Sequence, residues 1–273
     1  MYATINGASI FYVEDGDPSS FPVIFVHGFP FNHKMWIEQL ETTGRLYHAI
    51  AYDIRGHGES YVGDGQFTIE GHVDDLFALL DHLSLKKVVV VGLSMGGYVA
   101  LRALEREQDR FVAAVLCDTR SEADSNDAKL KRFANIALVK KEGSAAFAEK
   151  FLQVLFAPRS FEAQPEKVRL IREIITKTSP LSIAGTLLAL AARTDTTASL
   201  STIKIPTLIL VGELDQITPP AAAEAMHERI LGSELHIVPH AAHMSNLENT
   251  EFFNEKLLYF LKRVTSGSSY TGQ

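Results

Sequence analysis

Four consecutive valines, Val88–Val91, constrain the fold more than any other segment, because a strand built from them is apolar on both faces. Strands of this kind belong to parallel sheets that helices cover on both sides. Other short runs rich in apolar and β-branched residues recur along the chain, separated by segments of helical spacing. This alternation predicts a mostly parallel, open α/β sheet flanked by helices. The expected strands are Ser9–Val13, Val23–Val26, Tyr47–Tyr52, Lys87–Val91, Phe111–Cys117, Ile205–Val211 and Glu234–Val238.

Apolar residues at helical spacing occur in the segments that connect these strands. The first two expected strands are close together in the sequence, so we expect them to form an antiparallel hairpin at the start of the sheet. The expected helices of the sheet region are Ile69–Leu83, Met95–Glu107, Ala221–Ile230 and Asn249–Val264.

The alternation stops between Glu122 and Leu200, where four helical patterns occur. Prolines fall between these patterns, and proline can begin a helix but cannot continue one. We therefore expect an all-helical cap, residues 121–199, inserted into a core formed by residues 1–120 and 200–265. Residues 266–273 are small and polar and are expected to form a mobile tail. The expected cap helices are Asp127–Glu142, Ser144–Phe156, Pro165–Thr178 and Pro180–Arg193.

The chain carries 26 Lys and Arg against 33 Asp and Glu, a net charge of −7. This balance argues against nucleic acid or an anionic membrane surface as a partner, because both attract clustered positive charge. The longest apolar run, Phe111–Cys117, is far shorter than the ~20 residues that span a bilayer, and no secretory signal is apparent. Cys117 is the only cysteine, which excludes an internal disulfide and a cysteine-based zinc site. We expect a cytoplasmic protein that acts on a small molecule and for which homo-oligomers are possible.

The segment Gly92-Leu93-Ser94-Met95-Gly96 directly follows the valines and begins an expected helix. It matches G-x-S-x-G, in which a sharp strand-to-helix turn exposes the serine hydroxyl. Side chains at the two glycines would collide in so tight a turn, and the helix N-terminus would aim free N–H groups at a developing oxyanion. A dinucleotide site is the alternative for a glycine-rich turn after a buried strand, but Ser94 stands where that fingerprint needs glycine.

Three further elements accompany this turn. With them the chain resembles the α/β-hydrolase superfamily, over roughly residues 1–120 and 200–265. The resemblance implies a sheet of about eight strands, a nucleophilic Ser94, a base, an acid and an oxyanion hole. The three further elements are His27-Gly28-Phe29-Pro30, Asp53-Ile54-Arg55-Gly56-His57-Gly58-Glu59-Ser60 and a late Asp…His pair, and the Ser94 turn is the fourth.

In the superfamily, the residue after His-Gly and the residue after the nucleophile donate backbone N–H groups to the oxyanion. These positions are Phe29 and Met95 here. Pro30 stiffens the first of these loops. His27 ends an expected strand before the nucleophile, so we interpret it as structural rather than as the base. We interpret residues 55–60 in the same way, as a hydrogen-bonded loop that shapes the floor of the site.

For the acid, the resemblance implies Asp215, which closes the expected strand Ile205–Val211. Asp118 is the alternative, because some members of the superfamily carry the acid after the preceding strand. Glu213 is interpreted as a residue that caps the loop.

For the base, the resemblance implies His243 rather than His240. The superfamily histidine is followed five residues later by a glutamate, and Glu248 has this spacing from His243 only. Ala242 stands where the family usually has glycine, a departure that bears on the geometry of the loop.

No metal and no cofactor are expected. His240 and His243 lack the remaining ligands of a metal site, such as those of H-E-x-x-H. Other histidines, such as His72 and His82, are expected to be solvated on helix surfaces.

A serine nucleophile excludes the superfamily branches that open epoxides or displace halide, which use a carboxylate there. The chain is most similar to small esterases, enol-lactonases and cofactor-free haloperoxidases or perhydrolases. We therefore expect hydrolysis of carboxylic esters with small to medium acyl or alcohol groups, through a Ser-His-Asp acyl-enzyme mechanism. The alternatives are enol-lactonase or perhydrolase/haloperoxidase activity on the same residues, carbon–carbon bond hydrolysis, or a non-catalytic ligand-binding role.

Overall fold

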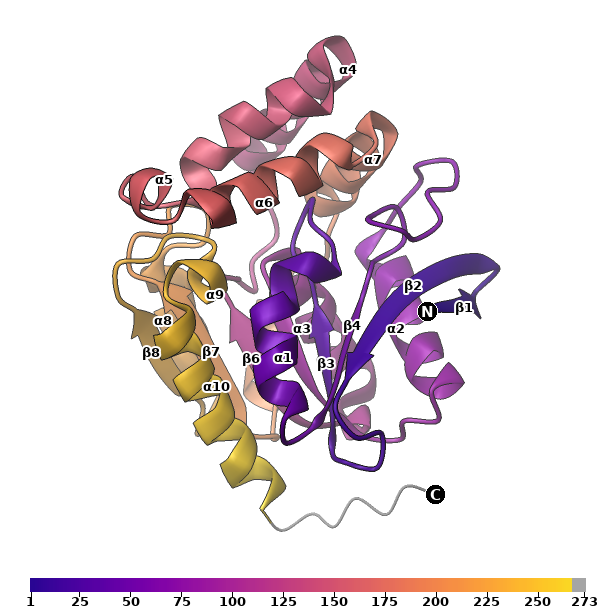
Figure 1. Ribbon diagram of the computed structural model, residues 1–273, viewed down its shortest axis with the longest axis vertical. Coiled ribbons are helices and arrows are strands. Elements are labelled where there is room, and N and C mark those ends of the chain that lie inside the picture. Colours follow the sequence, from indigo (N-terminus) through magenta and orange to yellow (C-terminus); the bar gives the residue numbers. More distant parts are fainter. Residues whose placement is uncertain (267–273) are drawn as a thin grey trace.

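The computed structural model describes residues 1–266, and an eight-stranded sheet forms its centre (Figure 1). The strand order is β1-β2-β4-β3-β5-β6-β7-β8. β1 pairs with β2 and β2 pairs with β4 in antiparallel fashion, and the other neighbouring pairs are parallel. The predicted α/β class with a mostly parallel sheet is confirmed. The strands are β1 (Tyr2–Ile5), β2 (Ala8–Asp15), β3 (Pro22–Val26), β4 (His48–Tyr52), β5 (Val88–Leu93), β6 (Phe111–Cys117), β7 (Thr207–Gly212) and β8 (Glu234–Val238).

The central strands are buried along their whole length, as their apolar runs require. Every residue of β3, β4, β5 and β7 is buried. Successive side chains of a strand point to opposite faces of the sheet, so the four valines of β5 contact both helical layers.

Helices cover both faces of the sheet, α1 and α10 on one and α2, α3 and α8 on the other (Figure 1). Four of them, α2, α3, α8 and α10, begin and end within one residue of the segments expected from the sequence, whereas α1 and the short α9 were not expected. These helices are α1 (Ile37–Gly44), α2 (Ile69–His82), α3 (Met95–Glu107), α8 (Pro220–Arg229), α9 (Ser245–Glu248) and α10 (Thr250–Thr265).

The expected hairpin between Ser9–Val13 and Val23–Val26 is wrong. β2 forms its hairpin with β1, and β3 lies between β4 and β5. The reason is the distribution of apolar residues. β3 is buried on both faces and suits the centre of a parallel sheet, whereas β1 alternates between exposed and buried residues and suits the edge.

Helices α4 to α7, which we call the cap helices, follow β6 and lie above one end of the sheet (Figure 1). Two expected helices, Asp127–Glu142 and Ser144–Phe156, are the two halves of α4, which Gly143 interrupts with φ 83° and ψ 176°. Residues of both halves line one cavity, so the chain folds back on itself at Gly143. The short α5 was not expected. The cap helices are α4 (Asn126–Leu155), α5 (Ser160–Ala163), α6 (Pro165–Lys177) and α7 (Pro180–Ala191).

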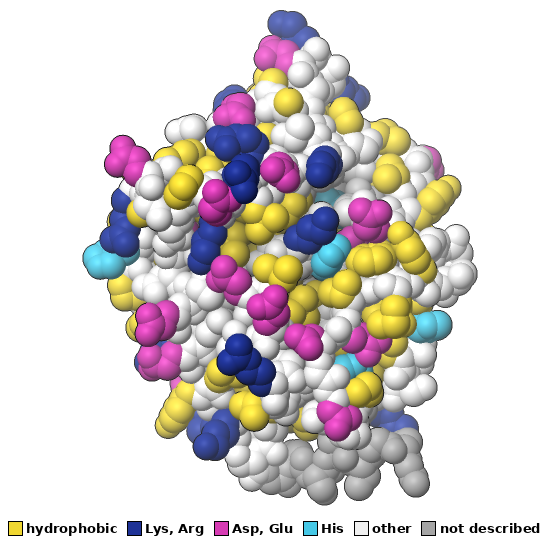
Figure 2. All heavy atoms as spheres, viewed as in Figure 1, with side chains coloured by type: hydrophobic (Ala, Val, Ile, Leu, Met, Phe, Trp, Pro, Cys, Tyr) yellow, Lys and Arg dark blue, Asp and Glu magenta, His cyan; other side chains and the backbone are white. Residues whose placement is uncertain are grey.

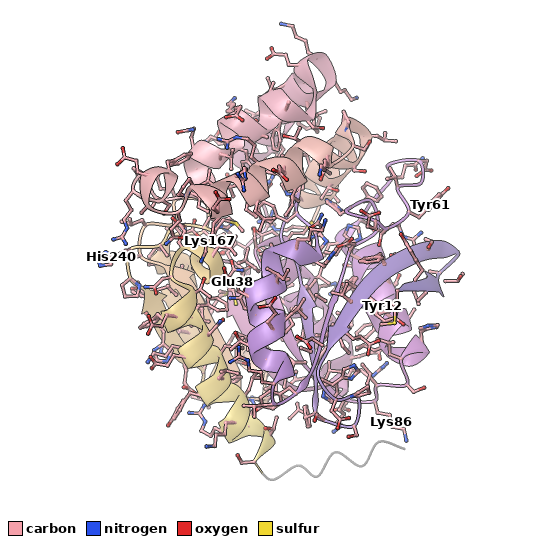
Figure 3. The ribbon with its side chains drawn as sticks, in the orientation of Figure 1. Tyr12, Glu38, Tyr61, Lys86, Lys167 and His240 are labelled. Carbon is pink, nitrogen blue, oxygen red and sulfur yellow. The ribbon has the colours of Figure 1, made fainter. Side chains whose placement is uncertain are left out.

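The surface mixes charged and apolar side chains, and Figure 2 shows acidic and basic residues interspersed over one face. Within residues 1–266, no single helix is long and apolar enough to cross a membrane; α6 and α7, bent by 96° where they meet, pass that test of length and composition only as a pair. Lys167 of α6 forms an ion pair with Glu38 of α1, with 3.2 Å between Nζ and Oε2 (Figure 3). The expected tail, 266–273, lies outside the described residues except for Ser266.

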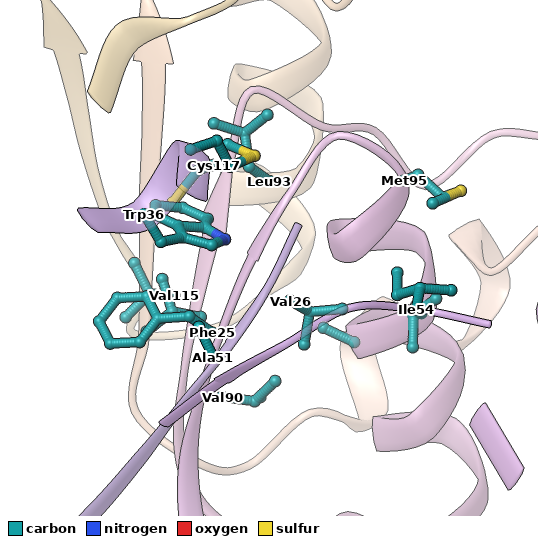
Figure 4. Close-up of a cluster of buried hydrophobic side chains, with 14 of the residues drawn as sticks. Phe25, Val26, Trp36, Ala51, Ile54, Val90, Leu93, Met95, Val115 and Cys117 are labelled. Carbon is teal, nitrogen blue, oxygen red and sulfur yellow. The ribbon is translucent and has the colours of Figure 1, made fainter. Parts of the chain in front are cut away.

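Trp36 fixes the segment after β3 against the sheet (Figure 4). Its side chain is fully buried, and its ring centroid lies 5.3 Å from that of Phe25 on β3 and 6.2 Å from that of Phe253 on α10. One aromatic side chain therefore joins the sheet to the last helix.

Replacing Trp36 with alanine leaves a cavity between β3 and α10. We expect Trp36→Ala to lower the free energy of unfolding by about 3–5 kcal/mol, measured by urea denaturation with circular dichroism. Ile37→Ala is the matched control, because the neighbouring Ile37 side chain is 47% exposed and loses little burial. Equal losses in the two variants would contradict this account of the packing.

Candidate active site

Ser94 is the single residue between β5 and α3, where the motif predicts it. Its φ of 54° and ψ of −113° lie in a region that L-residues rarely adopt. Two hydrogen bonds hold the turn against the end of β6: the Ser94 N–H donates to the Cys117 carbonyl at 2.9 Å, and the Thr119 hydroxyl donates to the Ser94 carbonyl at 2.9 Å. The turn is therefore fixed by the neighbouring strand.

Glycine is required on both sides of this turn because the backbone approaches it closely. A Cβ at Gly96 would lie 2.0 Å from the carbonyl oxygen of Val26, and a Cβ at Gly92 would lie 2.3 Å from that of Gly96. No side chain fits at such distances. The prediction that collisions demand these two glycines is confirmed.

His243, in the loop after β8, connects the two other residues of the expected triad. Its Nε2 lies 2.9 Å from Ser94 Oγ, and its Nδ1 lies 2.8 Å from Asp215 Oδ2. The three residues follow the parallel strands β5, β7 and β8, and all are at least nine-tenths buried. The structure thus places hydroxyl, imidazole and carboxylate in the order that nucleophilic catalysis needs.

The carboxylate of Asp215 is held by its own turn. Its Oδ1 accepts hydrogen bonds from the N–H groups of Ile217 at 2.8 Å and Thr218 at 3.0 Å, and its Oδ2 accepts one from the Thr218 hydroxyl at 2.6 Å. Burial alone would raise the pKa of Asp215, but His243 and the bonds from Thr218 lower it below its usual value. Asp215 is therefore an anion with a fixed orientation.

Thr218 was not expected from the sequence to belong to the site. Its hydroxyl bonds Asp215 and also lies 3.3 Å from His243 Nδ1, so it touches both members of the pair. A signal was available, because an aspartate followed by threonine three residues later can close a turn with side-chain hydrogen bonds.

Asp118, the alternative acid, makes no hydrogen bond with His243 in residues 1–266. It accepts hydrogen bonds from the Gly212 N–H at 2.8 Å and from the Ser245 hydroxyl. Burial, and then the charge of Asp215, raise its pKa well above the usual value. Asp118 therefore links the end of β7 to the start of α9 through hydrogen bonds and does not contact the imidazole.

His240 points away from the site. Figure 3 places it at the edge of the molecule, and its side chain is 67% exposed. Its backbone N–H donates to Glu213 at 2.8 Å, so Glu213 caps the loop as expected. Of the two candidate histidines, only His243 reaches the serine.

Of the two expected oxyanion donors, Met95 directly follows Ser94, and Phe29 follows Gly28, at which a Cβ would lie 3.2 Å from the Leu93 carbonyl oxygen. Met95 is the first residue of α3, so its N–H has no acceptor inside the helix. Among residues 1–266, no group accepts a hydrogen bond from the Phe29 N–H. Both N–H groups are available to an incoming oxygen.

Three buried histidines lie beneath the Phe29 loop. His27 contacts the Gly28 carbonyl through Nδ1 at 2.8 Å and accepts a hydrogen bond from the Ile54 N–H through Nε2 at 2.9 Å, which confirms its structural role. The expectation that His72 is solvated is wrong: it is 2% exposed, and its ring centroid lies 5.9 Å from that of Phe67. Burial lowers the pKa of His27 and His72 to about 4 and that of His57 well below its usual value.

Two cavities adjoin the site. One of about 430 Å³ is lined by Tyr98, one helical turn after Ser94, and by Ile217 in the Asp215 turn. The other, of about 310 Å³, lies between the halves of α4 and is lined by Phe147 and Phe151. The rings of both phenylalanines lie 6.1 Å from that of Phe29. Lys131, Asn135 and Lys150 also line this second cavity, so its wall is partly aromatic and partly polar.

In the part of the chain that the structure describes, no group of three or more His, Cys, Asp and Glu side chains could hold a metal ion. The side chains of the triad, Thr218 and Asp118 each have a hydrogen-bond partner within the protein.

The buried histidines make stability depend on pH. His27 and His72 have a pKa of about 4 when folded, against 6.5 for an ordinary histidine, so the unfolded chain binds more protons between these values. We expect the free energy of unfolding to fall as the pH is lowered from 6.5 towards 4, measured by urea denaturation at a series of pH values.

His72→Gln should make this dependence on pH shallower, whatever its effect on stability at pH 7. His82→Gln, at an exposed position of the same helix, serves as the control and should leave the dependence unchanged. An unchanged slope in His72→Gln would contradict the depressed pKa.

The chain is similar in sequence to proteins of a known family. A family model described as the alpha/beta hydrolase fold matches residues 22–250. The 3-oxoadipate enol-lactonase 2 of Acinetobacter baylyi is 29% identical over 260 residues, which cover 95% of this chain and 96% of that protein. A non-heme chloroperoxidase of Burkholderia pyrrocinia is 28% identical over 278 residues, covering 95% and 98%.

Among solved structures, a thermophilic esterase from Thermogutta terrifontis superposes with a TM-score of 0.92 and 36% identity, covering 97% of this chain and 98% of that one. The relatives and structural neighbours are enzymes, and they share both the length and the architecture of this chain. The match of the family model over most of the sequence shows that this protein is an enzyme of the α/β-hydrolase fold family.

Proposed function

We propose that the protein is a serine hydrolase that cleaves carboxylic esters with small to medium acyl or alcohol groups. The observation that carries this proposal is the unbroken line of contacts from Asp215 through His243 to Ser94, with distances of 2.8 and 2.9 Å. A buried imidazole between a carboxylate and a hydroxyl can take the hydroxyl proton and return it to a leaving group.

In the proposed reaction, Ser94 Oγ attacks the ester carbonyl while His243 Nε2 takes its proton. Asp215 stabilises the imidazolium that forms, and the N–H groups of Phe29 and Met95 donate hydrogen bonds to the oxyanion. His243 then protonates the leaving alcohol. A water molecule, deprotonated by His243, releases the acid and regenerates Ser94.

The aromatic side chains that surround Phe29 favour a substrate with an acyl or alcohol group of limited size. The cavity of about 310 Å³ between the halves of α4 has Phe147 and Phe151 in its wall. In this proposal the cap, residues 121–199, closes over the substrate, and the two aromatic rings exclude water from the acyl-enzyme.

A lactone is the second candidate substrate, because a lactone is a cyclic ester that the same residues could open. The similarity to an enol-lactonase along 95% of the chain favours it. Perhydrolysis or haloperoxidase chemistry on the same serine, carbon–carbon bond hydrolysis and a non-catalytic binding role are the remaining alternatives. Turnover of p-nitrophenyl esters from acetate to octanoate tests the esterase activity against the non-catalytic role and gives the chain-length preference.

Removing the serine hydroxyl removes the nucleophile. We expect Ser94→Ala to lower kcat for p-nitrophenyl acetate by about 10⁴–10⁶-fold. A fluorophosphonate probe should label the wild type and leave Ser94→Ala unlabelled. Ser182→Ala, a buried serine of α7 whose hydroxyl has no hydrogen-bond partner in the described chain, should keep both labelling and turnover. Labelling of another serine would overturn the assignment.

The two buried carboxylates should respond differently to the same substitution. Asp215→Asn removes the acceptor of the Nδ1 proton and the charge beside the imidazolium, so kcat should fall by about 10⁴-fold. Asp118→Asn should stay within about tenfold of the wild type, because Asp118 makes no hydrogen bond with His243 in residues 1–266 and an amide oxygen can still accept from the Gly212 N–H. The reverse order in steady-state assays would assign the acid to Asp118.

A further inference from the structure

A third buried carboxylate, that of Glu248, lies where the His243 loop meets the cap helices. Glu248 ends α9 and is 5% exposed. No lysine, arginine or histidine of residues 1–266 forms an ion pair with it, so neutral donors alone satisfy it. A buried carboxylate without a cationic partner costs folding free energy unless each of its oxygens accepts good hydrogen bonds.

The two oxygens of Glu248 bind different parts of the molecule. Oε1 accepts hydrogen bonds from the Ala157 N–H at 2.7 Å and from the Ser160 hydroxyl at 2.5 Å, both at the junction of α4 and α5 in the cap. Oε2 accepts one from the Ala242 N–H at 2.7 Å, and Ala242 directly precedes His243. One carboxylate therefore spans the cap and the loop that carries the imidazole.

Other contacts tie the same loop to the cap. The Met244 N–H donates to the Leu155 carbonyl at 3.2 Å, and the Gln164 side chain donates to the Glu248 carbonyl at 2.7 Å. Lys167, labelled in Figure 3, donates a hydrogen bond of 2.7 Å from Nζ to the Leu247 carbonyl. These contacts bind the backbone after His243 to the cap helices, and the bond from the Ala242 N–H to Glu248 holds the residue before it.

We propose that Glu248 is a positioning residue that couples the placement of the α4–α5 junction to the orientation of the His243 imidazole. This inference rests on the proposed serine hydrolase function. A substrate that fills the cap then also sets the geometry of the base, although no cap residue bonds His243 itself. An imidazole displaced by even 1 Å no longer faces the serine hydroxyl, and misplacements of this size cost on the order of 10²-fold in rate.

Glu248→Gln tests this coupling. The amide has a single accepting oxygen, and its NH₂ group must face either the Ala242 N–H or the cap donors, so one link breaks whichever way it turns. We expect kcat for p-nitrophenyl acetate to fall by about 10–100-fold, with KM within about threefold, at a temperature where circular dichroism shows a folded protein. The rate of fluorophosphonate labelling of Ser94 should fall in parallel with kcat.

Ser160→Ala removes one cap-side bond and leaves the bond to Ala242 intact. We expect a smaller loss of kcat, about 3–10-fold, consistent with one hydrogen bond to a charged acceptor. Ser182→Ala is the matched control, an identical change at a buried cap serine that does not contact Glu248, and its kcat should not change. In the Glu248→Gln background, Ser160→Ala should cause no further loss, because the path to His243 is already interrupted.

The outcomes separate this inference from the proposed function. A wild type that turns over no ester and whose Ser94 is not labelled overturns both. An active wild type, an inactive Ser94→Ala and a folded Glu248→Gln with kcat within twofold of the wild type overturn the coupling alone. If Glu248→Gln does not fold, the serine pair decides: equal kcat in Ser160→Ala and Ser182→Ala overturns the coupling, and a loss confined to Ser160→Ala supports it.

Discussion

Between Leu93 and Met95 the chain turns from a buried strand into a helix within one residue, and the rest of the site is arranged around that turn. The conformation of Ser94 is unfavourable for an L-residue, so the surroundings must hold it. The end of β6 does this through hydrogen bonds to both sides of the Ser94 backbone, and Gly96 lets β3 approach to a distance that no side chain allows. Strands of the central sheet therefore fix the serine on two sides, and the loops after β7 and β8 bring the imidazole and carboxylate to it.

The parts of the site that could be predicted are those with a local cause. The tight turn requires glycines in fixed positions around Ser94, and parallel strands end at one edge of the sheet, which brings Asp215 and His243 to the same place. The central strands could be predicted for a similar reason, since their burial on both faces shows directly as uninterrupted apolar residues. Their order could not, because the pairing of β3 with β4 and β5 depends on segments far along the chain.

The parts that were missed depend on partners distant in sequence. Glu248 was recognised only by its spacing from His243, and its bond to Ala157 joins residues 91 positions apart. His72 has the appearance of a surface residue in a helical pattern, and only the packing of α2 buries it. Thr218 acquires its second contact when the loop after β8 closes over the Asp215 turn. Side-chain contacts of this kind appear only once the chain is folded.

Asp118 and Asp215 follow neighbouring strands and are both buried, yet their surroundings drive their pKa values in opposite directions. Asp215 faces an imidazole and a threonine that bonds it twice, whereas Asp118 has a peptide N–H and a hydroxyl and lies near a second negative charge. Of two carboxylates at equivalent positions, one therefore bonds the His243 imidazole and the other bonds the backbone of Gly212 and the hydroxyl of Ser245.

The break at Gly143 bears on how the two halves of α4 can change in length during evolution. A Cβ at this position would meet nothing within 4 Å, so the glycine is needed for its backbone conformation alone. The two halves of α4 run out from the sheet and back, and the cavity between them has Phe147 and Phe151 in its wall. Equal lengthening of both halves at their outer end would deepen that cavity while leaving both ends of the excursion in place. The size of this cavity can therefore vary without any change in the strands and turn that hold Ser94.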